Sequence, residues 1–121
     1  MAEINIISLN CHGFNAGTAL YLRAIAHNAD IILLQETWLC DATYLKLTGA
    51  LRDFTVYHSS AMEDKVAIGI CTGRPFGGTA VLVHTKLGNQ TCRVAMDNPR
   101  LTAVRCQLKN NNDIIASVYA I

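Results

Sequence analysis

Two polar side chains near the start of the chain, Asn10 and Glu36, each follow a run of apolar residues. Asn10 ends the run INIISL, and Glu36 comes after Gln35 at the end of the run DIILL. A carboxylate and a carboxamide both offer oxygen atoms, the ligand type that a hard divalent cation takes while it keeps several waters. Asn10 and Glu36 are therefore the first candidates for chemistry in this sequence, provided that the fold brings them together.

A strand, a helix and a second strand are the elements that would bring Asn10 and Glu36 together. Residues 4–10 and 31–35 are predicted to be strands, and the second is apolar at consecutive positions, as in a strand covered on both faces. Between them lies the loop CHGFNAG, in which Asn15 is the expected helix N-cap. The apolar face of the helix that follows is expected to hold Ala19, Leu22, Ile25, Ala26 and Ala29. Such a unit closes as a right-handed crossover with parallel strands, so both carboxyl ends lie at one edge, where ligands tend to bind.

The rest of the chain is predicted to be mostly strands. A second helix is expected over residues 42–52, with Asp41 as its N-cap and with Tyr44, Leu47 and Leu51 on its buried face. The expected strands are residues 54–59, 79–86, 90–96, 100–109 and 113–119, with a long irregular loop over 60–78 and a turn over 110–112. An α/β start followed by a β-rich remainder indicates layers of sheet and helix.

The composition indicates one domain with few charged residues for its surface. Of the 121 residues, 51% are hydrophobic and 16% are charged, and the charged share is below the roughly 25% that is usual for soluble domains. A formal charge of +1 excludes attraction to nucleic acid or membranes through overall charge. Five basic residues, which we expect on a solvated face and not along a DNA track, are Arg74, Lys86, Arg93, Arg100 and Arg105.

The cysteines are odd in number and widely spaced. They are Cys11, Cys40, Cys71, Cys92 and Cys106, and no two of them form a C-x-x-C pair. This pattern argues against a disulfide framework and against a structural zinc site. The chain also has no apolar run of the ~18 residues that a membrane span needs and no signal-type start. We therefore expect an intracellular protein of the nucleus or cytoplasm with no membrane partner.

Four segments of the chain together resemble the endonuclease/exonuclease/phosphatase superfamily. They are SLNCHGF at residues 8–14, DIILLQETWL at 30–39, GGTAVLVH at 77–84 and SVYAI at 117–121. Within that superfamily the sequence is most similar to the apurinic-like endonuclease domain of non-LTR (LINE-type) retrotransposons. The resemblance covers essentially all of the chain but only about the first half of such a domain. Because the chain ends on the apolar run IIASVYAI, we expect residues 1–121 to be the N-terminal portion of one domain, truncated at its C-terminal end.

The resemblance implies a fold, a cofactor and three site residues. The implied fold is part of a four-layer α/β sandwich of the DNase I-like kind, and the implied cofactor is Mg²⁺, with Mn²⁺ as the alternative. Glu36 matches the metal-binding glutamate of the family, and Asn10 matches the asparagine that helps to hold the metal and the phosphate. Tyr119 matches the tyrosine of a Y-x-P motif beside the scissile phosphate, although Ile121 stands here in place of the proline.

The groups that activate the nucleophile in this family belong to the half of the domain that the chain does not contain. They are a His-Asp pair and a D-x-N motif. None of the four histidines replaces them: His12 is expected to be a loop residue without a catalytic role, His27 a surface residue, and His58 and His84 satisfied structural residues. Asp97 and Asn98 are expected to form a turn, and Trp38 to fill the core. We therefore expect the 121 residues to be inactive on their own.

Three functions remain open at this level. The first is a Mg²⁺-dependent endonuclease of a retrotransposon that nicks DNA and has a reverse transcriptase domain downstream. The second keeps the fold and metal but hydrolyses another phosphodiester, in a phosphoinositide, sphingomyelin or RNA. The third is an inactive remnant or a fragment that only binds. An incomplete sandwich also leaves strand edges open, which predicts self-association through the exposed sheet.

Overall fold

The structure is a computed structural model that describes residues 4–40, 43–60, 77–87, 91–95, 98, 100–108 and 111–118, and only the backbone of residues 107–108 and 111–118. Its elements in chain order are β1 (Ile6–Asn10), α1 (Ala16–Ile25), η1 (Ala26–Asn28), β2 (Ile31–Gln35), α2 (Leu45–Ala50), β3 (Phe54–Ser59), β4 (Thr79–His84), η2 (Thr85–Leu87), β5 (Thr91–Val94), β6 (Leu101–Leu108) and β7 (Asn111–Val118), where η is a short 3₁₀ helix. Most of the loop predicted over 60–78 lies outside the described residues. In the described part of the chain, no helix is both long and apolar enough to cross a membrane.

The described strands form two sheets. The first sheet has the order β1-β2-β4-β3, with β1 parallel to β2 and the other pairs antiparallel. The second sheet has the order β5-β6-β7 and is antiparallel throughout. In the first sheet one row of paired residues runs across the edge, from Asn10 to Gln35, Thr79 and Ser59. The predicted strand-helix-strand unit is therefore present, and its two carboxyl ends lie side by side.

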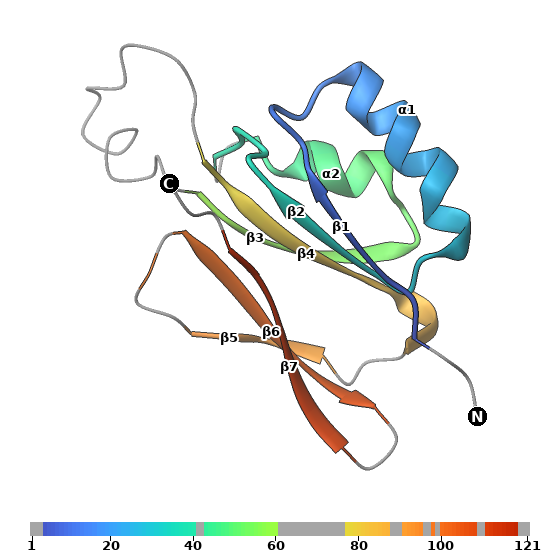
Figure 1. The fold of residues 1–121 in the computed structure, drawn as a ribbon, viewed down its shortest axis with the longest axis vertical. Helices are drawn as coiled ribbons and strands as arrows, with labels where there is room; N and C mark the ends of the chain where they lie inside the picture. Colours follow the sequence, from blue (N-terminus) through green and yellow to red (C-terminus); the bar gives the residue numbers. More distant parts are fainter. Residues whose placement is uncertain are drawn as a thin grey trace.

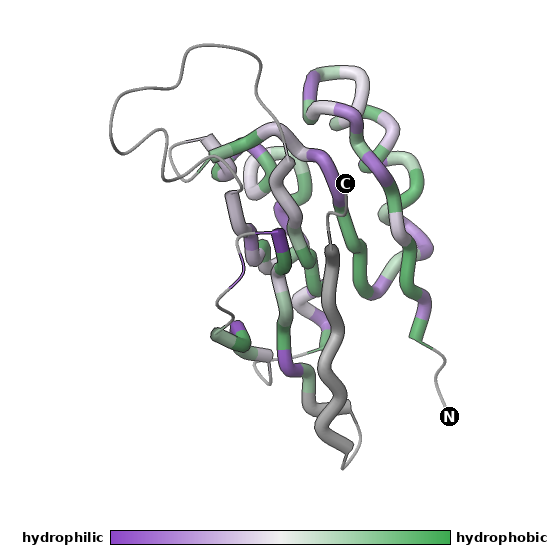
Figure 2. Tube along the Cα trace, turned by 60° about the vertical axis from the view of Figure 1, so that its left-hand side comes forward, coloured by the Kyte–Doolittle hydropathy of each residue, from purple (hydrophilic) through white to green (hydrophobic). Residues whose placement is uncertain are grey.

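Helices and the second sheet cover opposite faces of the first sheet. Figure 1 shows α1 and α2 together on one side and β5, β6 and β7 on the other. Alternate residues of β2 and β4 enter two separate cores: Ile32, Leu34, Ala80 and Leu82 pack against the helices, whereas Ile31, Val81 and Val83 pack against the second sheet. The hydrophobic stretches of the tube in Figure 2 follow these strands. The prediction that residues 31–35 are covered on both faces is thus confirmed.

Helix α1 begins where the sequence predicts. The side-chain oxygen of Asn15 accepts a hydrogen bond from the backbone N–H of Thr18 at 3.0 Å, which satisfies one of the free donors at the helix start. On the inner face Leu22 is fully buried. Arg23 then ties the helix to its neighbour, because its Nε donates to the carbonyl oxygen of Ala50 at the end of α2.

The prediction for the second helix is too long. The sequence predicts a helix over residues 42–52, whereas α2 runs from Leu45 to Ala50. The predicted cap, Asp41, lies outside the described residues. A turn precedes the helix instead. Thr43 Oγ1 accepts the backbone N–H of Cys40 at 2.9 Å, and the N–H groups of Thr43 and Tyr44 donate to the carbonyl of Cys40. This local bonding competes with the helix and delays its start.

Two strand boundaries also differ from the prediction. The turn predicted over residues 110–112 is wrong for its last two residues, because Asn111 and Asn112 belong to β7 and pair with Leu108 and Gln107. Strand β4 ends at His84 and not at Lys86. There the ring Nδ1 of His84 accepts the N–H of Lys86 at 3.0 Å, which favours the 3₁₀ turn that follows the strand.

Candidate metal and phosphate site

The loops that follow β1 and β2 remain paired beyond the sheet. The N–H groups of Cys11, Gly13 and Phe14 donate to the carbonyls of residues 35, 36 and 37, each at 2.8 Å. Asn10 and Glu36 therefore lie at the same edge on two loops that hold each other, which is the juxtaposition that the strand-helix-strand pattern predicts.

Glu36 has a backbone conformation that residues other than glycine rarely adopt. Its φ is 51°, and that of Trp38, two residues later, is 60°. Such left-handed conformations cost on the order of 1–3 kcal/mol each at non-glycine residues and persist only where the surroundings enforce them. Here the N–H groups of Thr37 and Trp38 donate to the carbonyls of Gly78 and Gly77 at 3.1 and 2.9 Å, which fastens the loop to the start of β4. The side chain of Glu36 is 26% exposed. The strained loop places its carboxylate at the edge of the sheet.

Asn10 is oriented by its own loop. Its side-chain oxygen accepts the backbone N–H of His12 at 3.0 Å. A carboxamide oxygen has two acceptor positions, so one remains for a cation. The amide is therefore preorganised with an oxygen donor at the edge that Glu36 also occupies.

His12 is close to the carboxylate of Glu36 but is open to solvent. Its Nδ1 lies 3.8 Å from Oε2 of Glu36, and its side chain is 84% exposed. An ion pair this exposed contributes little to stability. The geometry agrees with the prediction of a loop histidine.

Trp38 is part of the site loops and not of the core. It is half-buried, so the prediction that it fills the core is wrong. Its ring packs on that of His12, with centroids 5.0 Å apart, and on Gly13, whose φ of 95° leaves no room for a side chain. The positive φ at residue 38 turns the indole from the core toward the loop that follows β1.

Cys11, which follows Asn10, is not a thiolate. Burial raises the pKa of its thiol to about 12, so the sulfur stays protonated at neutral pH. Sulfur is also a soft ligand, whereas Mg²⁺ takes oxygen ligands, so Cys11 does not suit a Mg²⁺ site.

The donor set at this edge fits Mg²⁺ better than zinc. In the part of the chain that is described, no three His, Cys, Asp or Glu residues gather at one point, as a structural zinc site requires. Mg²⁺ instead takes one or two carboxylates and keeps several waters. Glu36 with the oxygen of Asn10 matches that requirement as a partial shell, and Mn²⁺ takes the same ligand type. The third predicted site residue, Tyr119, lies outside the described residues, as does Asp97.

His58 was missed as a residue of this region. It is 5% exposed and its Nε2 is hydrogen-bonded to Oγ1 of Thr37 at 2.8 Å. The expectation of a satisfied structural histidine is wrong in one respect, because its buried Nδ1 has no hydrogen-bond partner among the described residues. An alternating strand pattern gives no sign of this, since Thr37 is distant in the sequence.

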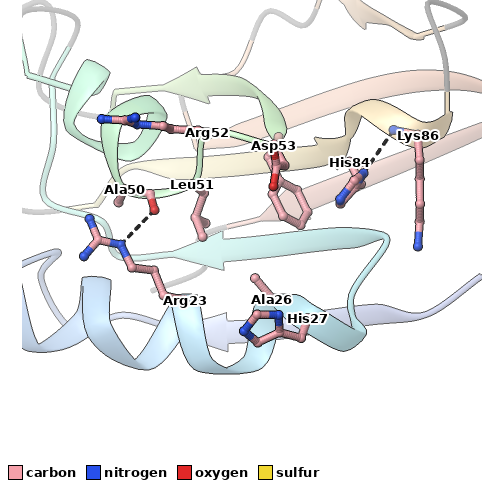
Figure 3. A pocket seen from close by; sticks show the side chains of 10 residues that line it. Arg23, Ala26, His27, Ala50, Leu51, Arg52, Asp53, His84 and Lys86 are labelled. Carbon is pink, nitrogen blue, oxygen red and sulfur yellow. Dashed lines mark hydrogen bonds between the residues drawn. The ribbon is translucent and has the colours of Figure 1, made fainter.

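A cavity of about 330 Å³ lies at the opposite edge of the first sheet, away from Asn10 and Gln35. Figure 3 shows Arg23, His27, Arg52, His84 and Lys86 around it. Two of the basic groups here have structural partners: Lys86 pairs with Asp30, and Arg23 binds the backbone of α2. Together with the N–H of Asn5, Lys86 holds the pKa of Asp30 below its ordinary value. We interpret this end of the molecule as a stabilising charge network.

Comparison with known proteins identifies the family. Residues 7–118 match the model of the Endonuclease/Exonuclease/phosphatase family, and the chain belongs to that family. No curated protein sequence matches it significantly.

Solved structures show the same fold. The endonuclease domain of TRAS1, a telomere-specific non-LTR retrotransposon, aligns with a TM-score of 0.61 at 18% identity over 98% of this chain and 46% of that one. The 3′ phosphatase NExo (D146N) from Neisseria, bound to product DNA hairpin, aligns at 0.55 and 14% identity over 93% and 40%. An AP endonuclease from Archaeoglobus fulgidus aligns at 0.50 and 14% identity over 94% and 40%.

The layers seen here are thus part of a DNase I-like α/β sandwich, as the sequence predicts. The chain spans less than half the length of each of these structures.

Proposed function

We propose that this chain provides the metal-binding side of a Mg²⁺-dependent endonuclease of the retrotransposon type, which nicks one strand of DNA. One observation carries the proposal: the carboxylate of Glu36 is held by a strained, fastened loop at the same sheet edge as the preorganised oxygen of Asn10. The likeness to the TRAS1 endonuclease domain favours DNA as the substrate.

In this proposal the residues of the chain bind the cation and orient the phosphate. The Glu36 carboxylate and the Asn10 oxygen hold the cation against the scissile phosphate, with Tyr119 beside that phosphate. A bound Mg²⁺ supplies charge neutralisation for the phosphoryl transition state.

The general base comes from outside the 121 residues in this proposal. His12, whose Nδ1 lies 3.8 Å from Oε2 of Glu36, is 84% exposed, and so it lacks the buried, oriented setting expected of a general base. Residues 1–121 are then the N-terminal portion of the domain, and a reverse transcriptase domain follows in the full-length protein. We place that protein in the nucleus or cytoplasm, where DNA or its RNA template is available. The fragment alone is inactive and self-associates through open strand edges.

One observation favours a second candidate, removal of phosphate from a DNA 3′ end. The Neisseria structure is that of a 3′ phosphatase with a product DNA hairpin, and it aligns over 93% of this chain. The same metal and ligands would serve both reactions, since both stabilise charge on a phosphoryl group.

A nicking assay tests the proposal. Supercoiled plasmid and a 3′-phosphorylated DNA hairpin are incubated with Mg²⁺ and either the 121-residue chain or the chain extended through its native downstream sequence. We expect nicked plasmid from the extended chain only, and no activity after Glu36→Gln. Asp53→Asn, which removes an exposed carboxylate at the opposite edge, is the matched control and should retain activity.

Release of inorganic phosphate without nicking would replace the first candidate by the second. A folded extended chain that acts on neither substrate would contradict both and leave an inactive remnant or a phosphodiesterase for another substrate.

A further inference from the structure

The loop that carries Glu36 is connected to a buried histidine on another strand. The hydroxyl of Thr37, which is 0% exposed, lies 2.8 Å from Nε2 of His58 in β3. Strands β2 and β3 are not neighbours, because β4 lies between them. The hydrogen bond therefore joins the end of β2 to β3 across the start of β4.

Gly78, at the start of β4, makes room for this hydrogen bond. A β-carbon at residue 78 would lie less than 3.0 Å from Oγ1 of Thr37 and 3.4 Å from Nε2 of His58. The φ of Gly78 is 88°, a conformation that favours glycine. Its carbonyl also accepts the N–H of Thr37 at 3.1 Å. A glycine is thus required at the point where the side chains of Thr37 and His58 meet.

The hydroxyl of Thr37 makes two hydrogen bonds. Besides the contact with His58, Oγ1 accepts the backbone N–H of Leu39 at 3.3 Å. This bond closes the turn around Trp38, whose φ is positive, and Thr37 also directly follows Glu36, whose φ is positive as well. A hydroxyl is one donor and two acceptors, so both contacts can form together.

The main polar contact of the His58 imidazole is its hydrogen bond with Thr37. Burial, and to a lesser extent the charge of Arg93, lowers the pKa of His58 to about 4, so the ring is neutral. Its ring stacks on Tyr44 with centroids 5.7 Å apart and planes 5° apart. A phenylalanine ring would fill the same space without burying the unpaired Nδ1. Packing alone therefore does not explain a histidine here, whereas the contact with Thr37 does.

We propose that His58, through its hydrogen bond to Thr37, is a positioning residue that keeps the carboxylate of Glu36 in the orientation that binds the cation. The inference rests on the proposed function, since it names what supports the metal ligand of that site. Residues behind metal ligands commonly change metal affinity by 10- to 100-fold when they are replaced.

The experiment measures the dissociation constant of Mn²⁺ for the extended chain by electron paramagnetic resonance and, beside it, the Mn²⁺ concentration that half-saturates plasmid nicking. Thr37→Val keeps the shape and removes the hydroxyl, His58→Phe keeps the aromatic stack and removes the nitrogen, and Thr37→Ser keeps the hydroxyl. We expect the first two to raise the half-saturating Mn²⁺ concentration by about 10-fold or more. Thr37→Ser should restore the wild-type value.

Thr102→Val is the matched control for loss of a buried hydroxyl. Thr102 is buried, and its Oγ1 lies 2.8 Å from Oγ1 of Thr79, between the two sheets. Because Thr79 pairs with Gln35, this contact lies near the edge that carries Glu36 but is separate from the hydrogen bond between Thr37 and His58. The Thr102→Val substitution should lower the urea midpoint of unfolding but leave the Mn²⁺ requirement unchanged.

The outcomes separate the inference from the function on which it rests. If nicking depends on Glu36 but Thr37→Val and Thr37→Ser share the wild-type Mn²⁺ requirement, the positioning role is overturned and the proposed function stands. A rise in the Mn²⁺ requirement with Thr102→Val as large as that with Thr37→Val would also overturn the positioning role. If no variant nicks DNA but the wild type binds Mn²⁺ and Thr37→Val and His58→Phe weaken that binding, the proposed function fails and the positioning role stands. If the wild type binds no Mn²⁺, the positioning role is overturned.

Discussion

Gly13 and the indole ring of Trp38 approach so closely that a β-carbon on residue 13 would lie less than 3.0 Å from Cε3 of Trp38. This contact joins the loop after β1, which carries Asn10, to the loop after β2, which carries Glu36. With a φ of 95° at Gly13, the backbone also excludes other residues on conformational grounds. The packing of the two loops of the candidate site against each other therefore depends on a glycine at residue 13.

Gly13→Ala should destabilise the chain. Both the left-handed φ and the overlap with Trp38 act against a methyl group, and we expect a loss of about 1–3 kcal/mol in the free energy of unfolding. Urea denaturation followed by Trp38 fluorescence measures it. Gly49→Ala is the control, because Gly49 lies within α2 with no atom near the added methyl. That change should stabilise by about 0.5–1 kcal/mol, and equal effects of both substitutions would contradict this reading.

Asn15→Ala should weaken helix α1. The change removes the side-chain oxygen that accepts the N–H of Thr18, and loss of an N-cap of this type costs about 1 kcal/mol. The free energy of unfolding in urea is the measurement. Asn15→Asp retains an acceptor oxygen and should keep most of the stability; a loss as large as that with alanine would exclude the cap as the cause.

Lowering the pH should destabilise the protein in two separate ranges. The first involves His58, whose pKa in the fold is about 4 against an ordinary value of 6.5. As the pH falls below 6.5, the unfolded chain takes up a proton that the folded chain refuses, so stability decreases down to about pH 4 and then levels off. The total is about 3 kcal/mol.

His58→Phe should remove the decrease in stability that His58 causes between pH 6.5 and 4. The groups nearest the ring that could alter the effect are Arg93, which donates to the carbonyl of His58, and Tyr44, which stacks on it. Urea unfolding at several pH values gives the slope. An unchanged slope in the phenylalanine variant would show that other groups cause it.

The second range involves Asp30, whose pKa is lowered by the N–H of Asn5 and by Lys86. Its stabilising effect is complete above the ordinary aspartate value of about 3.9 and disappears as the pH falls below that value through the lowered pKa. Asp30→Asn should therefore destabilise more at pH 6 than at pH values below the lowered pKa of Asp30. Lys86→Met, which removes the more exposed partner, should have a smaller effect at pH 6.

The sequence predicts well where the local pattern is decisive. Residues 31–35 are apolar at every position but the last, and β2 covers just that range. Asn15 before a helical pattern is a strong cap signal, and the cap is present. The placement of Asn10 beside the end of β2 follows from the handedness of one crossover, which few sequences evade.

It predicts poorly where a contact is remote or where local signals compete. The run of asparagines after Leu108 is typical of a turn, yet pairing with β6 draws Asn111 into the strand. The positive φ of Glu36 has no marker in a motif without glycine. The hydrogen bond between Thr37 and His58 passes β4, which lies between β2 and β3 in the sheet but follows both in the sequence. The spacing of residues along the sequence therefore does not predict this bond.

The most direct test of the account is whether Glu36 binds a divalent cation. Mn²⁺ titrated into the purified extended chain and followed by electron paramagnetic resonance reports free and bound metal without need of a substrate. The account predicts one site that Glu36→Gln abolishes and Asp53→Asn leaves intact. Binding that survives Glu36→Gln, or that Asp53→Asn weakens as much, would contradict it.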